Sequence, residues 1–132
     1  MKKLLLFFIV FGLFSSFCIA EKSTVNAVSI VNKWTWEKSI GGANNPYTAT
    51  PKTSGFSKKV VFTSDGRVIT YKNDIEIRNS QYEIGKGVGL ADNLEHDLIT
   101  FEGKTYVIEK LDNQNLTILS NNSDATRTIY KR

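Results

Sequence analysis

The sequence predicts an all-β domain of eight antiparallel strands arranged as an up-and-down barrel. Past residue 32, short apolar-rich runs alternate with turn residues, and no helical periodicity of useful length interrupts them. Turn pairs such as Asn73-Asp74 and Asp112-Asn113 join consecutive runs, so neighbouring runs pair as antiparallel hairpins. Closing such a meander on itself removes its two free edges.

Each predicted strand is a short run with apolar residues at alternate positions. In the first run, Trp34 and Trp36 share one face, and we assign Trp34 to the barrel floor. The phase of the alternation slips within 75–84, which predicts a β-bulge at Asn79 or Ser80. The eight predicted strands are 33–39, 57–63, 68–72, 75–84, 98–101, 104–111, 115–119 and 126–131.

Residues 1–20 have the pattern of a secretory signal peptide, with two lysines, an apolar run and small residues near its end. Cleavage after Ala20 yields an exported protein, either periplasmic or secreted. Cleavage before Cys18 would instead yield an outer-membrane lipoprotein, the only route by which we expect membrane attachment. The bulky Phe17 fits a lipidation site poorly, so we favour the first alternative.

The mature chain divides into a leader, 21–32, and one β-domain, 33–132. Thr24 could cap a short helical plug in the leader, and an extended leader is the alternative. All 13 acidic residues but only 15 of the 17 basic ones follow residue 20, so the mature charge is +2. This charge gives no argument for a nucleic-acid partner. No cysteine follows Cys18, so stability must come from the core, and we expect a monomer.

Two predicted connections, 40–56 and 85–97, are longer than ordinary hairpin loops. Strand parity in a meander predicts that they lie at opposite ends of the barrel. The second contains Gly85-x-Gly87-x-Gly89, which lacks the following helix that a phosphate-binding loop needs. We interpret these residues as hinge glycines.

A set of residues carries a resemblance to the small lipocalin-like domains of bacterial exported proteins. The set comprises Trp34, the Gly41-Gly42 pair leading into a loop with Tyr47, VVFTSDGRVITYKN, QYEI and TYVIEKLDNQNLTIL. It extends from about Asn32 to Tyr130, and its order and spacing are more specific than any one motif. The chain departs from full-size lipocalins in having Asn32-Lys33-Trp34 in place of Gly-x-Trp and in its shorter length. The resemblance implies an eight-stranded barrel of calycin type.

The sequence offers little that could catalyse a reaction. Its one histidine, His96, lies in a polar loop between Glu95 and Asp97, and three adjacent residues do not readily converge on one ion. No serine near it lies on a sharp strand-to-helix turn. We therefore predict no enzyme activity, no catalytic residues, no metal site and no cofactor.

Aromatic residues are the one enriched resource of the mature chain. Small-ligand pockets are lined mainly by apolar and aromatic side chains. Trp36, Tyr47, Phe56 and Phe62 flank or adjoin the longest loop, so we predict that they line a ligand-binding pocket at one barrel mouth. The sequence thus predicts an exported protein that binds a small apolar or amphipathic ligand. The alternative is a filled barrel that acts through its loops, as an interaction protein or an inhibitor of a hydrolase.

Overall fold

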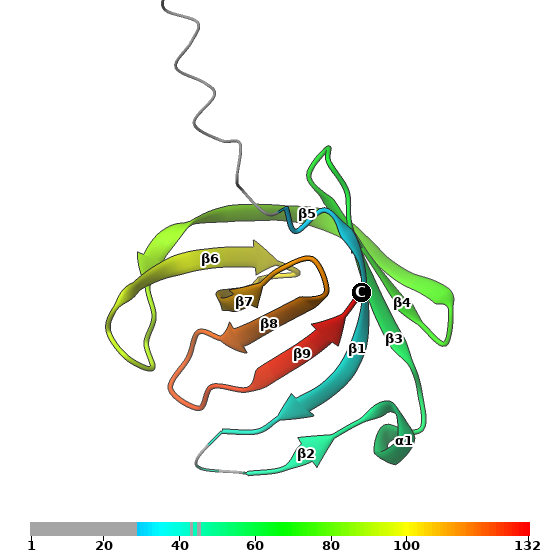
Figure 1. Ribbon diagram of the computed structural model, residues 1–132, viewed down its shortest axis with the longest axis horizontal. Helices are drawn as coiled ribbons and strands as arrows, with labels where there is room; N and C mark the ends of the chain where they lie inside the picture. The colour runs from blue at the N-terminus through cyan, green and yellow to red at the C-terminus, as the bar shows by residue number, and fades with distance from the viewer. Residues whose placement is uncertain (1–28, 43, 45) are drawn as a thin grey trace, which may run out of the picture.

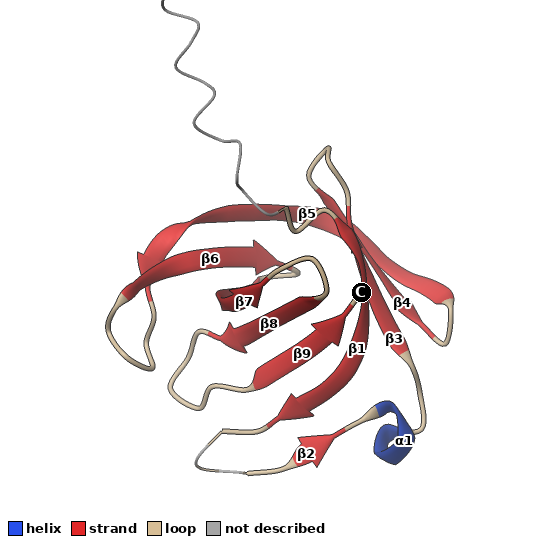
Figure 2. Cartoon of the chain, in the orientation of Figure 1, coloured by secondary structure: helices blue, strands red, loops and turns tan. Residues whose placement is uncertain are grey.

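The computed structural model describes residues 29–42, 44 and 46–132. The predicted signal peptide and most of the leader, including Thr24 and Cys18, lie outside these residues. The described chain is all-β, with one short helix (Figure 2). Its elements are β1 (Asn32–Ile40), β2 (Thr48–Ala49), α1 (Pro51–Ser54), β3 (Lys58–Phe62), β4 (Arg67–Lys72), β5 (Ile75–Val88), β6 (Glu95–Phe101), β7 (Lys104–Leu111), β8 (Asn115–Ser120) and β9 (Arg127–Lys131). No helix in this part of the chain is long and apolar enough to cross a membrane.

The strands form one antiparallel sheet that closes into a barrel-like ring (Figure 1). The order is β2-β1-β3-β4-β5-β6-β7-β8-β9, and β9 also pairs with β1, with Trp36 opposite Tyr130. The predicted pairing of the last strand with the first is confirmed. The sheet has nine strands where the sequence predicted eight, because the two-residue β2 pairs with the end of β1 outside the ring.

The buried interior of the ring is aromatic and aliphatic. Trp34 is fully buried, as predicted, and its indole Nε1 donates to the Ile30 carbonyl oxygen at 2.9 Å. Phe62 meets Tyr82 and Phe101 edge-on, with ring centroids 5.0 and 5.6 Å apart. The remaining buried members of this core are Ile30, Trp36, Val60, Val68, Ile99, Leu116, Ile118 and Tyr130.

The predicted bulge occurs a few residues earlier in the strand than expected. The register between β4 and β5 shifts between Thr70 and Tyr71, which pair with Arg78 and Glu76. Ile77 is therefore the extra residue, and the sequence prediction of Asn79 or Ser80 was wrong. Because the bulge precedes Arg78, this residue keeps the period-2 phase of Ser80 and Tyr82 and shares their face, whereas a bulge at Asn79 or Ser80 would have separated them.

The glycines of 85–89 are not hinges. Gly85 and Gly87 belong to β5, which continues to Val88, and β6 already begins at Glu95. A Cβ on Gly87 would lie 2.6 Å from Leu98 Cδ1, and one on Gly89 would lie 2.8 Å from the ring of His96. These two glycines lack side chains because residues of β6 cover that face of β5.

The two long connections do not lie at opposite ends of the ring. Gly42 is so close to the β8–β9 connection that a Cβ there would lie 2.8 Å from the Ala125 carbonyl oxygen. The amide of Leu90, in the β5–β6 connection, donates to Asn121 Oδ1 at 2.8 Å. Strand parity assumes strands of equal span, whereas β5 has 14 residues and β8 has 6.

Candidate functional site

A hollow of about 320 Å³ opens beside the connection between β1 and β3, and we call it the aromatic hollow. Its main wall is a stack of Trp36 and Phe56, with ring centroids 5.6 Å apart and planes inclined by 21°. Trp36 Nε1 donates to Ser39 Oγ at 3.0 Å, which fixes the indole. The lining residues are Trp36, Ser39, Phe56, Lys58, Lys72, Ile77 and Arg78.

The short helix α1 leads the chain to Phe56. Thr50 caps it by accepting from the Thr53 amide, Pro51 occupies its first turn, and Gly55 ends it with a φ of 82°. This sequence turns the chain back towards the sheet directly before Phe56. Phe56 then packs on the buried Trp36.

Three cations surround the aromatic wall. Lys58 alternates with the buried Val60 and Phe62, so it lies on the inward face of β3. Lys72 lies in the same way on the inward face of β4. The register places Lys58 directly opposite Lys72, and the Lys72 Nζ lies 4.7 Å from the centroid of Phe56. Arg78 completes the set from β5.

A single carboxylate reaches this group of cations. Glu102, in the β6–β7 turn, pairs with Arg78 at 3.0 Å between Oε2 and Nε. The same oxygen accepts from the hydroxyl of the buried Thr70 at 2.9 Å. Burial lowers the pKa of Lys58, and the positive charges of Arg78 and Lys104 lower it further against the opposing effect of Glu102.

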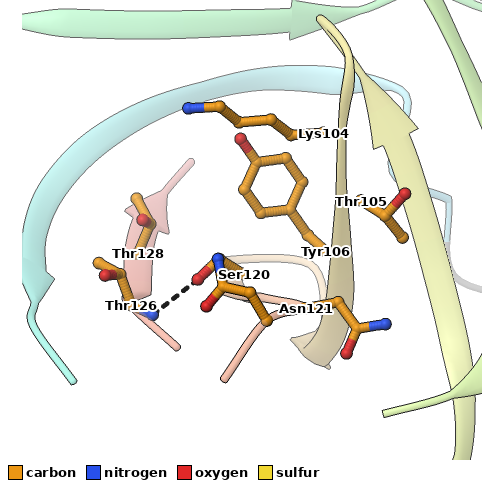
Figure 3. A pocket seen from close by; sticks show the side chains of 8 residues that line it. Lys104, Thr105, Tyr106, Ser120, Asn121, Thr126 and Thr128 are labelled. Carbon is orange, nitrogen blue, oxygen red and sulfur yellow. Dashed lines mark hydrogen bonds between the residues drawn. The ribbon is translucent and has the colours of Figure 1, made fainter. Parts of the chain in front are cut away.

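A second, polar hollow of about 500 Å³ adjoins the first, and we call it the hydroxyl hollow. Ser39 Oγ and Thr128 Oγ1, one from each hollow, are 3.5 Å apart. In Figure 3 the Lys104 and Tyr106 side chains extend to one side of β7 and Thr105 to the other. Its lining residues are Lys104, Thr105, Tyr106, Ser120, Asn121, Asn122, Thr126 and Thr128. We call the two hollows together the basic mouth.

Tyr106 connects the hydroxyl hollow to the core. Its ring packs on Phe101 with centroids 5.1 Å apart, and burial, with a smaller effect of Glu102, raises the pKa of its phenol. Ser120 Oγ accepts from the Thr126 amide at 2.7 Å (Figure 3). The neutral hydroxyls of this hollow offer hydrogen bonds to a polar group without adding charge.

The four residues predicted to line a pocket are not all brought together. Trp36 and Phe56 form the wall of the aromatic hollow. Phe62 is buried in the core, and Tyr47 is 47% exposed on the β1–β2 connection; neither lines this hollow. The sequence prediction missed Lys58, Lys72 and Arg78, although the period-2 alternation of β3 and β4 already placed both lysines on inward faces.

A larger hollow, of about 590 Å³, lies elsewhere, where β6 and β7 separate beyond the pair of Leu98 and Val107. Ile84 and Ile108 line it with the charged Asp97, Glu109 and Lys110. It lacks an aromatic stack and its charges are of both signs. Volume does not identify a ligand site without convergent polar groups, so the basic mouth is the better candidate.

Metal-binding groupings are absent from the described ranges. No group of three or more His, Cys, Asp or Glu that could hold a metal occurs there. The His96 Nε2 lies 2.8 Å from Asp92 Oδ2 within the β5–β6 hairpin. The Leu94 amide and, to a smaller extent, His96 lower the pKa of Asp92.

Comparison of the chain with family models, curated proteins and solved structures finds no match. The geometry of the basic mouth is therefore the basis for inferring function.

Proposed function

We propose that the chain is an exported, lipocalin-like protein that binds a small amphipathic ligand in the basic mouth. In this proposal β1 and β3–β9 act as an eight-stranded up-and-down barrel of lipocalin type. The interior of such a barrel is just wide enough for its own side chains or for one small ligand. Here the core around Trp34 and Phe62 fills part of the interior, and the aromatic and hydroxyl hollows occupy another part.

The observation that carries the proposal is the composition of the aromatic hollow. A volume of about 320 Å³ falls within the usual range of small-ligand sites, roughly 300–1,000 Å³. Its stacked rings supply apolar contact, and its lysines and arginine supply polar groups that can fix a ligand's orientation. Apolar walls with a few convergent polar groups are the ordinary signature of a binding pocket.

A binding role fits the chemistry of the site better than an enzymatic one. The mouth contains neither a histidine nor a cysteine among its lining residues, and its one nearby carboxylate is held by Arg78 and Thr70. We further propose export to the periplasm or the medium as a monomer, with a lipoprotein anchored at Cys18 as the alternative.

Native mass spectrometry of protein purified from its own cell envelope tests the binding proposal. We expect a co-purifying small molecule, and a response of tryptophan fluorescence to part of a panel of neutral and charged amphiphiles, because Trp36 lines the hollow. A clean apo mass together with no response to any panel member would contradict it. N-terminal sequencing separates cleavage after Ala20 from a blocked, lipidated Cys18.

One observation favours the second candidate, an interaction protein or hydrolase inhibitor that acts through its loops. Val88, Leu90 and Leu94 on the β5–β6 hairpin are 53%, 57% and 61% exposed. Exposed apolar side chains gathered on one hairpin can mark a protein contact. Failure of every small ligand, together with capture of an exported hydrolase that Leu90→Ser abolishes, would favour this candidate.

A further inference from the structure

The cations of the basic mouth repel one another in the free protein. Lys58 and Lys72 are direct cross-strand partners on β3 and β4, and like charges directly opposite each other destabilise a sheet. Lys104 approaches from β7, near enough to lower the pKa of Lys58. Among the described residues that line the two hollows, none is Asp or Glu.

The nearby Glu102 balances only part of this charge. Its Oε2 is already engaged by the Arg78 guanidinium at 3.0 Å and by the Thr70 hydroxyl at 2.9 Å. Four cations, from β3, β4, β5 and β7, thus face one carboxylate. Neutral residues at these positions would avoid this electrostatic cost. The excess positive charge therefore favours binding of a partner that carries negative charge.

The wall beside these cations suits an apolar body. Trp36 is only 6% exposed and stacks on Phe56, and Ile77, the bulged residue, is 44% exposed at the rim of the same hollow. A flat ring or short acyl chain would cover these groups. An acidic group attached to it would then reach the ammonium of Lys58, which is partly buried.

We propose that the basic mouth is a receptor for an organic anion, whose apolar body packs on Trp36 and Phe56 and whose acidic group lies among Lys58, Arg78 and Lys104. This inference rests on the proposed function and names the ligand's chemical class. A cationic ligand would meet four like charges. A neutral ligand would leave the repulsion between Lys58 and Lys72 in place, whereas an anion relieves it.

Three naphthalene compounds of matched shape separate these cases: 1-naphthoate, 1-naphthamide and 1-naphthylmethylammonium. Isothermal titration calorimetry of the mature chain at low and high salt measures each affinity. We expect naphthoate to bind at least about tenfold more tightly than the amide, because hydrogen bonds to a charged group are the stronger ones. The advantage should shrink at high salt, and the ammonium compound should bind least.

We expect two variants to change the affinity for naphthoate in opposite directions. Lys58→Gln removes a cation that faces the ligand and should lower the affinity for naphthoate about tenfold. Glu102→Gln removes the carboxylate that competes with the ligand for the cations, and it should raise the affinity for naphthoate several-fold. Lys59→Gln is the matched control, because Lys59 is adjacent in sequence, lies on the opposite face of β3 and pairs with Asp74 at 2.9 Å; it should leave the affinity unchanged.

The outcomes separate this inference from the proposed function. If naphthamide binds as tightly as naphthoate, the mouth binds small molecules but does not select anions, and the inference fails alone. The inference also fails if Lys58→Gln and Lys59→Gln lower the affinity for naphthoate equally, or if Glu102→Gln lowers that affinity. If none of the three compounds and no member of the panel of neutral and charged amphiphiles binds, both proposals fail.

Discussion

The electrostatic account of the mouth predicts that Lys58→Gln makes the free protein more stable. Lys58 is partly buried and lies directly opposite Lys72. A cross-strand pair is worth roughly 0.2–1 kcal/mol, and burial of the ammonium adds a cost of the same sign. We expect a gain of about 1 kcal/mol in the free energy of unfolding, or about 4 °C in Tm for a domain of this size. Most substitutions destabilise, so the sign of this change is informative.

The same variant makes a prediction about pH. The pKa of Lys58 is lowered in the folded chain, chiefly by burial and then by Arg78 and Lys104, with Glu102 opposing them. Below its folded pKa the lysine is charged in both states, so the folded state bears the full cost. As pH rises from the folded pKa towards the ordinary value of 10.5, the unfolded chain binds more protons and the wild type regains stability. The Tm advantage of Lys58→Gln should therefore narrow as the pH rises.

Thermal melts of the wild type and of Lys58→Gln between pH 7 and 10 measure both effects. Lys59→Gln is again the control, because it breaks the exposed ion pair with Asp74 and should cost between about 0 and 1 kcal/mol. A lower Tm for Lys58→Gln at pH 7, or an advantage that does not change with pH, would refute the reasoning.

The remaining predictions concern the framework around the mouth. Trp34→Ala should cost about 3–5 kcal/mol in a urea melt, because the indole is fully buried and bonded to Ile30; an unchanged midpoint would remove it from the core. Ser80→Ala should change stability by less than about 0.5 kcal/mol, because the buried Ser80 hydroxyl has no partner among the described residues; a loss above about 1.5 kcal/mol would mean that it does. Gly85→Ala should stabilise by about 0.4–1 kcal/mol, since nothing lies within 4 Å of a Cβ there, whereas Gly87→Ala should destabilise; equal effects in chemical denaturation would contradict this contrast.

Much of the fold could be predicted from the sequence, because alternation and turn chemistry are local signals. The turn at Asn73-Asp74 appears as predicted, with both residues at positive φ. The helix α1 was missed because four residues are too few for helical periodicity, although Thr50 and Pro51 carry its capping signal. The extension of β5 was missed because Gly85 and Gly87 are poor strand residues by themselves, and the contact with Leu98 accounts for Gly87 alone.

Only part of the candidate site could be predicted from the sequence. Trp36 and Phe56 were predicted from their position beside the long connection. Lys58 and Lys72 lie on faces whose alternation was recognised, but a lysine at the end of an inward face is easily assigned to solvent. Arg78 could not be assigned to the same face without locating the bulge at Ile77, and Lys104 joins the group only through closure of the ring.

The central claim is that the basic mouth receives an organic anion. Titration of ¹⁵N-labelled mature protein with 1-naphthoate, followed by the backbone amide shifts, tests it most directly. We predict shifts concentrated at Trp36–Ile40, Phe56–Lys58 and Lys72–Arg78, with smaller ones at Glu102–Tyr106. Shifts centred on Ile84 and Ile108, around the hollow between β6 and β7, or no saturable shifts at all, would contradict the account.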